Sequence, residues 1–196
     1  MSTITTRVLT GDDLEAVLED VARLRIDVFR DWPYLYDGSL DYERSYMESY
    51  RGKDHAVVVG AFDKDRLIGA ATGTPLEDHA GDFAAPFAGT GLGLKDVFYC
   101  AESVLLPTYR GRGLGHAFFD AREAHARRIG ASFSAFCSVI RPVDHPLRPA
   151  SYRPLDGFWR KRGYAPMEGV VARFTWADVD EAEPTEKALQ FWGRAL

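Results

Sequence analysis

The stretch "YRGRGLGHAFF", residues 109–119, places three glycines and two arginines directly before a segment with helical spacing. Glycine lets the backbone come close to a ligand, and the first turn of a helix has unpaired N–H groups and a partial positive charge. Such a helix start attracts phosphate, and Arg110 and Arg112 add mobile positive charge. We therefore interpret the stretch as a cradle for a pyrophosphate group.

Two familiar phosphate-binding loops do not match this stretch. A P-loop of the ATPase kind requires a Lys-Ser/Thr pair after its last glycine, whereas Gly115 is followed by His116. A dinucleotide-binding loop counted from Gly111 requires glycine where His116 stands, and one counted from Gly113 requires a small residue where Phe118 stands. These mismatches disfavour a nucleotide-binding domain of unrelated fold, which is kept as an alternative interpretation.

Hydrophobic spacing along the chain predicts mixed α and β structure. Strands are predicted at residues 5–10, in two runs of 55–76 joined by a hairpin turn at 63–65, and at 96–107, 132–140, 169–179 and 187–192. Helices are predicted from residue 11 through Leu24 and at 40–50, 114–129 and 155–163, while 77–95 is an irregular connection or a short helix. This order predicts one mixed sheet with helices on its faces.

Length, charge and composition narrow the class of protein. The 196 residues suffice for one domain with a full hydrophobic core, so a single domain over 1–196 is expected. The formal net charge of -5 disfavours a protein whose main task is to bind nucleic acid. The start lacks a secretory signal, and no apolar run approaches the roughly 20 residues of a membrane span, so we expect a cytoplasmic protein without membrane contact. Two cysteines and five histidines show no ligand-like spacing, so no metal site is expected.

The glycine-rich stretch resembles the acyl-CoA binding signature of the GNAT superfamily of N-acyltransferases. That signature, Arg/Gln-x-x-Gly-x-Gly/Ala, is matched by Arg110, Gly113 and Gly115. The longer run "VLLPTYRGRGLGHAFF" looks like the superfamily's fourth strand, turn and third helix, and "FWRKRGY", residues 158–164, resembles its "FYxxxGF" element. Together with the order of elements, the resemblance covers residues 4–192.

The resemblance implies an α/β fold with a mixed, mostly antiparallel sheet whose fourth and fifth strands separate and admit the pantetheine arm of acetyl-CoA. The backbone of the fourth strand would pair with pantetheine, and the amides after it would hold the pyrophosphate. The implied cofactor-binding residues are Val104, Leu105, Leu106, Arg110, Gly111, Arg112, Gly113, Leu114, Gly115 and His116. The implied activity is direct transfer of an acetyl group from acetyl-CoA to a small-molecule or peptide amine, with a homodimer left open.

Glu102 interrupts an otherwise apolar strand, at the point where the resemblance implies that the fourth and fifth strands separate. An amine acceptor is mostly protonated at pH 7, because the pKa of a lysine-like group is about 10.4, so a base must take a proton before attack. Glu102 is the predicted base, since an unpaired carboxylate in an apolar strand is costly without a function. The alternative is a buried glutamate held by an arginine of a neighbouring element.

The CoA thiolate that leaves the thioester also needs a proton. The tyrosine of "FYxxxGF" is Trp159 here, so we predict Tyr152 as a replacement, against the alternative of a tyrosine packed at a helix start. Cys137 lies in an apolar strand and is interpreted as packing rather than as a nucleophile. A non-catalytic acyl-CoA-binding sensor or interaction module of the same fold is therefore the alternative function.

The resemblance places the acceptor between residues 30–38 and residues 141–154. The first loop offers aromatic side chains, and the second is long, stiffened by four prolines and rich in cations. The expected acceptor-binding residues are Tyr34, Tyr36, Arg141, His145 and Arg148. These cations favour an amine that also bears a carboxylate or phosphate, while arginines that are solvated or that contact the cofactor's phosphates are the alternative. The sequence identifies neither the acceptor nor the preferred acyl chain.

Overall fold

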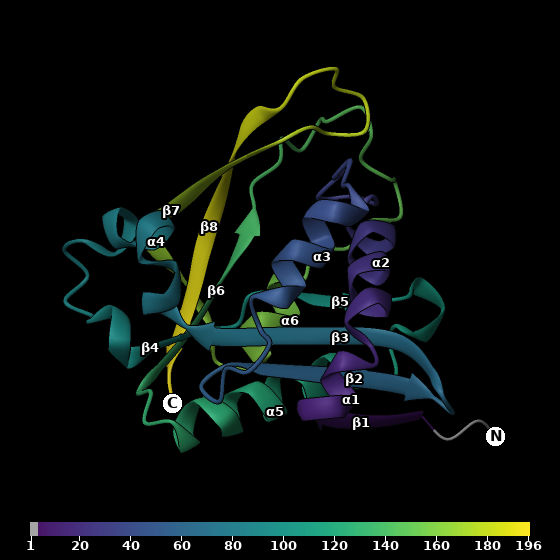
Figure 1. Cartoon of the computed structure of the whole chain (residues 1–196). Helices are drawn as coiled ribbons and strands as arrows, with labels where there is room; N and C mark the ends of the chain where they lie inside the picture. The colour runs from purple at the N-terminus through teal and green to yellow at the C-terminus, as the bar shows by residue number, and fades with distance from the viewer. Residues whose placement is uncertain (1–3) are drawn as a thin grey trace.

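The computed structural model describes residues 4–196 and contains one eight-stranded sheet (Figure 1). The strands are β1 (Ile4–Leu9), β2 (Val57–Asp63), β3 (Arg66–Pro75), β4 (Val97–Tyr99), β5 (Ser103–Leu105), β6 (Phe133–Val139), β7 (Ala165–Trp176) and β8 (Thr185–Ala195). Their order is β1-β2-β3-β4-β6-β8-β7, with β5 paired to β3. The β4 and β6 pair is parallel and the other pairs are antiparallel, so the predicted mixed, mostly antiparallel sheet is confirmed.

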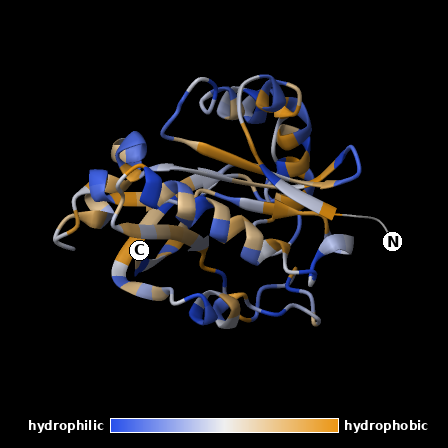
Figure 2. Cartoon of the chain, turned by 90° about the horizontal axis from the view of Figure 1, so that it is seen from below, coloured by the Kyte–Doolittle hydropathy of each residue, from blue (hydrophilic) through white to orange (hydrophobic). Residues whose placement is uncertain are grey.

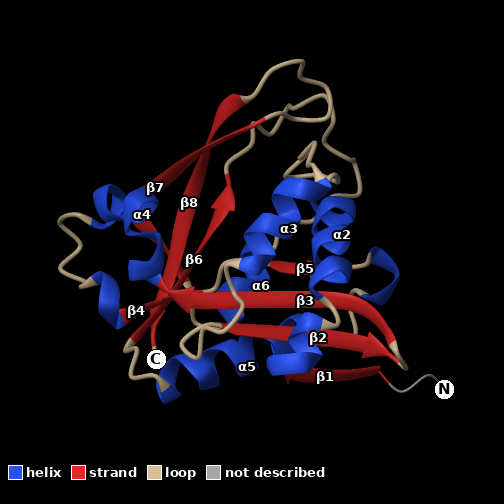
Figure 3. Ribbon diagram, in the orientation of Figure 1, coloured by secondary structure: helices blue, strands red, loops and turns tan. Residues whose placement is uncertain are grey.

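Helices cover both faces of this sheet (Figure 3). They are α1 (Gly11–Glu15), α2 (Leu18–Phe29), α3 (Leu40–Glu48), α4 (Ala80–Phe87), α5 (Leu114–Arg128) and α6 (Asp156–Lys161), with short 3-10 turns at Leu76–His79, Leu94–Asp96 and Pro107–Tyr109. No helix among residues 4–196 is long and apolar enough to cross a membrane.

The alternation of side chains along β2 shows how the sheet divides the core. Val57 and Val59 belong to the cluster under α5 and α6, whereas Val58 and Phe62 belong to the cluster under α1, α2 and α3. A third cluster joins α4 to β4, β6, β7 and β8. Figure 2 shows hydrophobic residues along the central strands, while the helices carry hydrophobic and hydrophilic residues in alternation.

The helix predicted from residue 11 is two helices, α1 and α2, separated by a turn at residues 16–17. The spacing that predicted it is nevertheless correct, because all five apolar positions are buried, namely Leu14, Val17, Leu18, Val21 and Leu24. The turn lets both helices direct these side chains into one core cluster. The uncertain segment at 77–95 contains the short helix α4.

The central strand predicted over 96–107 is two short strands, β4 and β5. β4 pairs with β6 in parallel, and the Cys100 N–H still donates to the Ala135 carbonyl at 2.8 Å. β5 is shifted off this line and pairs with β3, while β6 continues to Val139 against β8. The line of β4 and β5 therefore separates from β6 beyond Cys100. The resemblance predicts this separation for the superfamily's fourth and fifth strands.

The last two strands are longer than predicted. β7 begins at Ala165 rather than 169, and the short strand expected at 187–192 is the 11-residue β8. The register of the pair shifts between Pro166 and Val171, so the alternation of apolar residues is interrupted where β7 begins.

Candidate functional site

The glycine loop forms the turn between β5 and the start of α5. Gly111 and Gly113 have φ angles of 76° and 82°, in the left-handed region that other residues rarely adopt. A Cβ at either position would meet nothing within 4 Å, so backbone conformation rather than crowding requires glycine here. Gly113 is also the N-cap residue of α5, directly before Leu114.

Five consecutive amides in this loop have no acceptor within residues 4–196. The Arg110 N–H donates to the Pro107 carbonyl at 3.2 Å, and the His116 N–H donates to the Gly113 carbonyl at 3.0 Å. Between them, the N–H groups of residues 111–115 make no hydrogen bond to any atom of residues 4–196. Unpaired amides at the start of a 15-residue helix create a positive potential, so this loop can hold an anion such as pyrophosphate.

The two arginines of the loop are exposed and lie against its backbone. The Arg110 Nε donates to the Leu105 carbonyl at 3.2 Å, and the Arg112 guanidinium donates to the Thr108 carbonyl at 3.1 Å. Each guanidinium carries five N–H donors, so both can still reach a phosphate.

The backbone groups of β5 point in two directions. The Thr72 N–H donates to the Glu102 carbonyl and the Leu106 N–H donates to the Ile68 carbonyl, so both ends of β5 are bonded to β3. Because these directions alternate along a strand, the backbone groups of Val104 also point toward β3. The backbone groups of Ser103 and Leu105 point the other way, toward the gap between β5 and β6. Of the three residues predicted to pair with pantetheine, Leu105 has its backbone groups turned toward the gap.

Glu102 lies in the break between β4 and β5 and forms a buried ion pair with Arg25 of α2. The Arg25 guanidinium also pairs with Glu43 of α3, so one cation serves two buried carboxylates. The Tyr46 hydroxyl donates to Glu102 Oε2 at 3.1 Å. Burial lowers the pKa of Arg25, but Glu102, Tyr46 and Glu43 together outweigh burial and raise that pKa above its usual range. The arginine partner of the alternative interpretation is present, and the role of Glu102 as a base stays a prediction.

Arg25 and Glu43 are the residues of this cluster that sequence reasoning missed. Arg25 follows the buried Val21 by four positions, and Glu43 precedes the buried Met47 by four. Residues four apart share one face of a helix, so charged residues at these positions signalled a buried ion pair.

The two loops predicted to border the acceptor do lie together. The Trp32 ring packs 5.0 Å from the His145 ring and 5.9 Å from the Tyr152 ring, measured between centroids. Burial raises the pKa of Tyr152, so the hydroxyl stays protonated at neutral pH. Arg148 donates to the Val143 carbonyl at 3.1 Å, and its guanidinium lies 5.7 Å from the Tyr152 ring centroid.

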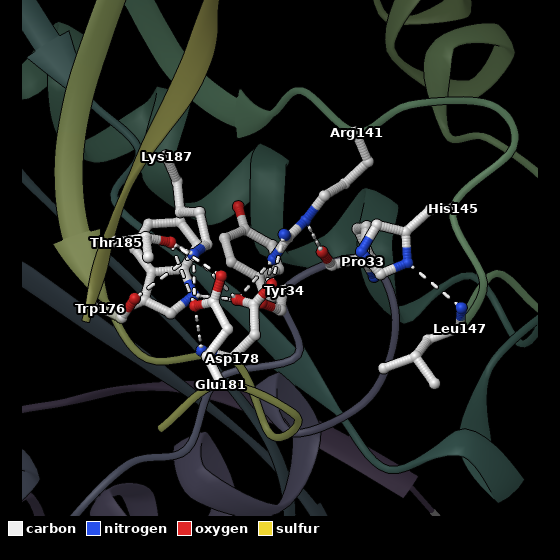
Figure 4. Close-up of polar contacts among 10 residues, drawn as sticks. All are labelled: Pro33, Tyr34, Arg141, His145, Leu147, Trp176, Asp178, Glu181, Thr185 and Lys187. Atoms are coloured by element: carbon white, nitrogen blue, oxygen red, sulfur yellow. Dashed lines mark hydrogen bonds and ion pairs between the residues drawn. The ribbon is translucent and has the colours of Figure 1, made fainter. Parts of the chain in front are cut away.

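Arg141 differs from the role predicted for it. Its guanidinium bonds the carbonyls of Pro33 and Tyr34 and both carboxylate oxygens of Asp178 (Figure 4). Only 8% of the Arg141 side chain is exposed. Since its donors are satisfied inside the chain, we correct the prediction and assign Arg141 to holding the loops rather than to an anionic group of the acceptor. Asp178 was missed because no local pattern links it to residue 141.

The two predicted tyrosines of the first loop face the interior. Tyr34 packs against the core cluster that contains Tyr99 and Cys137, and burial raises the pKa of its hydroxyl. Burial and the Glu43 carboxylate raise the pKa of Tyr36.

Trp159, which replaces the family's tyrosine, and Cys137 both pack against core residues. The Trp159 ring lies 5.0 Å from the Phe136 ring and 5.1 Å from the Trp192 ring. Burial raises the pKa of Cys137 to about 12, which agrees with its interpretation as an unreactive packing residue. No group of three or more His, Cys, Asp or Glu side chains within the described chain is placed to hold a metal ion.

A family model described as the acetyltransferase (GNAT) family matches residues 20–148. No curated protein matches the sequence. A ribosomal-protein-alanine N-acetyltransferase from Brucella melitensis is 15% identical, with a TM-score of 0.64 over 98% of this chain and 99% of the other. An N-acetyltransferase from Staphylococcus aureus Mu50 is 13% identical, with a TM-score of 0.61 over 99% of each chain. The yncA structure from Salmonella typhimurium, solved with its cofactor acetyl-CoA, is 14% identical, with a TM-score of 0.58 over 98% and 94% of the two chains.

Proposed function

The chain belongs to the GNAT family of acetyltransferases, and on that premise we propose that it transfers an acetyl group from acetyl-CoA directly to the nitrogen of an amine. The observation that carries this proposal is the row of unpaired amides at residues 111–115, which follows β5, the strand that pairs with β3 and not with β6. An acyl-CoA needs an anchor for its pyrophosphate and an extended backbone edge for its arm. Both features occur here within one short stretch of chain.

The residues of the loop fit the cosubstrate in type and position. Acetyl-CoA supplies the activated acetyl group, while this chain binds and orients it. The amides of 111–115, with Arg110 and Arg112, would hold the pyrophosphate. The backbone groups of Ser103 and Leu105 that face the gap would pair with the pantetheine amides.

Glu102 is the proposed proton acceptor. The amine must lose a proton before its nitrogen can attack the thioester carbonyl, after which the carbon–sulfur bond breaks and the sulfur takes a proton. Arg25 and Tyr46 fix the Glu102 carboxylate at the break in the sheet, where the attack would take place. Tyr152, from the loop beside Trp32, is the proposed donor to the sulfur.

The acceptor is proposed to carry an anionic group in addition to its amine. Since Arg141 is neutralised by Asp178, this proposal rests on Arg148, whose guanidinium keeps donors beyond the one bound to Val143. A screen of amino-acid amines and peptides against spermidine and kanamycin tests it. Polycations as the better substrates, or an Arg148→Gln variant with unchanged KM values, would contradict this preference.

Binding and turnover separate the proposed function from its alternative. Calorimetric titration with acetyl-CoA, ATP and NAD should show binding of acetyl-CoA alone, and CoA release should follow with at least one amine of the screen. Binding without release for every amine would favour a non-catalytic acyl-CoA-binding module, for which the core position of Trp159 and the Arg25–Glu102 pair argue. Absence of acetyl-CoA binding would contradict both functions.

A further inference from the structure

Three segments that are far apart in the chain meet at one buried ion pair (Figure 4). Arg141 follows β6, and Asp178 lies between β7 and β8. The two guanidinium NH groups donate to the two Asp178 oxygens at 2.5 and 2.9 Å. The side chains are 8% and 3% exposed, so this is a bidentate pair shielded from solvent, which is both strong and directional.

The same guanidinium holds the loop at residues 30–38. Arg141 donates to the Pro33 carbonyl at 2.7 Å and to the Tyr34 carbonyl at 2.6 Å. The Trp176 Nε1 donates to the Tyr34 carbonyl at 3.2 Å and to Asp178 at 3.0 Å. Because four donors converge on two carbonyls and one carboxylate, the bend at residues 33–34 has one position relative to the strands.

Asp178 is itself held in place by Glu181 and Lys187. The Asp178 N–H donates to Glu181 at 3.0 Å, and the Lys187 ammonium lies 2.8 Å from Glu181 and 3.6 Å from Asp178. The Val179 N–H also donates to the Leu35 carbonyl at 2.7 Å, which ties the β7–β8 connection to the loop. Two cations and two carboxylates therefore balance one another, and Asp178 cannot turn away without losing several bonds.

The carbonyl that accepts from Arg141 and Trp176 belongs to Tyr34, whose side chain packs into the core. Its ring packs against the core cluster that contains Tyr99 and Cys137, together with Ala101 and Val139 on either side of the break. The Tyr34 ring also packs 4.8 Å from the Phe29 ring. The position of this phenol beside the break in the sheet thus depends on the Arg141–Asp178 pair.

We propose that Arg141 and Asp178 are positioning residues for the acceptor, a role that rests on the proposed function. By holding the carbonyls of residues 33–34, the pair fixes Tyr34 and the aromatic loop beside the break and so sets the affinity for the acceptor. None of its hydrogen-bond partners within residues 4–196 lies in the glycine loop. The pair therefore leaves acetyl-CoA binding unaffected.

Two variants and a matched control test this role. Asp178→Asn keeps the shape and removes the charge, while Arg141→Lys keeps the charge and removes the planar fork. The control, Arg173→Gln, breaks an ion pair with Glu186 on the same hairpin, in which both side chains are more than half exposed. Amide hydrogen exchange of 30–38 and 109–117, calorimetric affinity for acetyl-CoA, and steady-state constants with L-alaninamide, spermidine and kanamycin are measured for each.

Both variants should speed exchange of residues 30–38 by about tenfold or more and leave residues 109–117 unchanged. The acetyl-CoA affinity should stay within about twofold of the parent value, while the KM of each amine that is turned over rises about tenfold with a smaller change in kcat. The control should show none of these effects.

The proposal is overturned if folded variants exchange residues 30–38 at the parent rate, or if acetyl-CoA affinity falls as much as the amine KM rises. Should Asp178→Asn fail to fold, Arg141→Lys decides the question. A parent protein that binds acetyl-CoA but acetylates no amine contradicts the proposed function instead, and with it the effect on acceptor affinity.

Discussion

The glycine loop and the loops proposed to bind the acceptor, residues 30–38 and 141–154, are built in different ways. The glycine loop offers the backbone amides of 111–115, and its conformation depends on residues next to one another in sequence. The acceptor side depends on side chains that join distant segments, since Arg141 bonds carbonyls 108 and 107 positions away. A site made from local backbone tolerates changes of its side chains, whereas a site made from buried side chains does not.

The largest effect expected from this comparison is on stability. Arg141→Ala leaves Asp178 buried without its partner, so the free energy of unfolding should fall by about 3–5 kcal/mol. Arg112→Ala, on the exposed glycine loop, should change it by about 0.5 kcal/mol or less. Urea denaturation of both variants measures the difference. Equal losses would show that the two sides of the site are equally dependent on side chains.

Glu102→Gln is expected to have the next largest effect, and it acts on turnover. The amide preserves the shape of the carboxylate but cannot accept a proton, so kcat should fall about a hundredfold or more. Acetyl-CoA affinity should change little, because the glycine loop is separate from this cluster. Stopped-assay kinetics over pH 6–9 check the prediction, and near-normal turnover with an unchanged pH profile would make Glu102 a structural residue.

A smaller effect is expected from a side chain in the glycine loop. In Gly115→Val, the new side chain would stand beside the open amides and 3.3 Å from the Phe158 ring, so acetyl-CoA should bind about tenfold more weakly. Gly81→Val is the matched control, because Gly81 is likewise the second residue of a helix and has open space around it. Unchanged acetyl-CoA affinity in a folded Gly115→Val variant would remove the loop from the cofactor site.

The smallest effect concerns acid. A backbone hydrogen bond from Asp178 and the Lys187 side chain lower the pKa of Glu181 to about 2, below its ordinary value of 4.5. Glu181 therefore stabilises the fold above pH 4.5, and this contribution is lost as pH falls from 4.5 toward 2. Because 30% of the side chain is exposed, about 1 kcal/mol or less is involved. The difference in Tm between parent and Glu181→Gln should shrink between pH 6 and pH 3, and a constant difference would contradict the assignment.

The same contrast explains what could be predicted from the sequence. The glycine loop, α5 and the hairpin of β2 and β3 follow from local patterns of glycine and apolar spacing, and these patterns carry the family resemblance. The break between β4 and β5 was not predicted as two strands, because both halves are apolar and pair with β3. The assignment of Glu102 to a special position was possible because one charge interrupts that apolar run.

The acceptor side could be predicted only in part. The aromatic and proline-rich composition of its loops was visible, and the structure brings those loops together. The partner of Arg141 could not be predicted from the sequence, because Asp178 lies 37 positions away in a connection that has no periodic pattern. Which arginine of residues 141–153 is buried is decided by these distant contacts and not by the loop's own sequence.

The order of the strands also has a consequence for the growing chain on the ribosome. β7 joins the sheet through β8, which lies between it and β6 although it follows both in the chain. Strands β1 to β3 can pair early, since they are neighbours in both sequence and space. Until residues 185–195 are made, β6 has an unpaired edge, and Lys187 cannot pair with Asp178 and Glu181. The loops proposed to bind the acceptor are therefore completed only after β8 has paired, while the glycine loop can form before β8 is made.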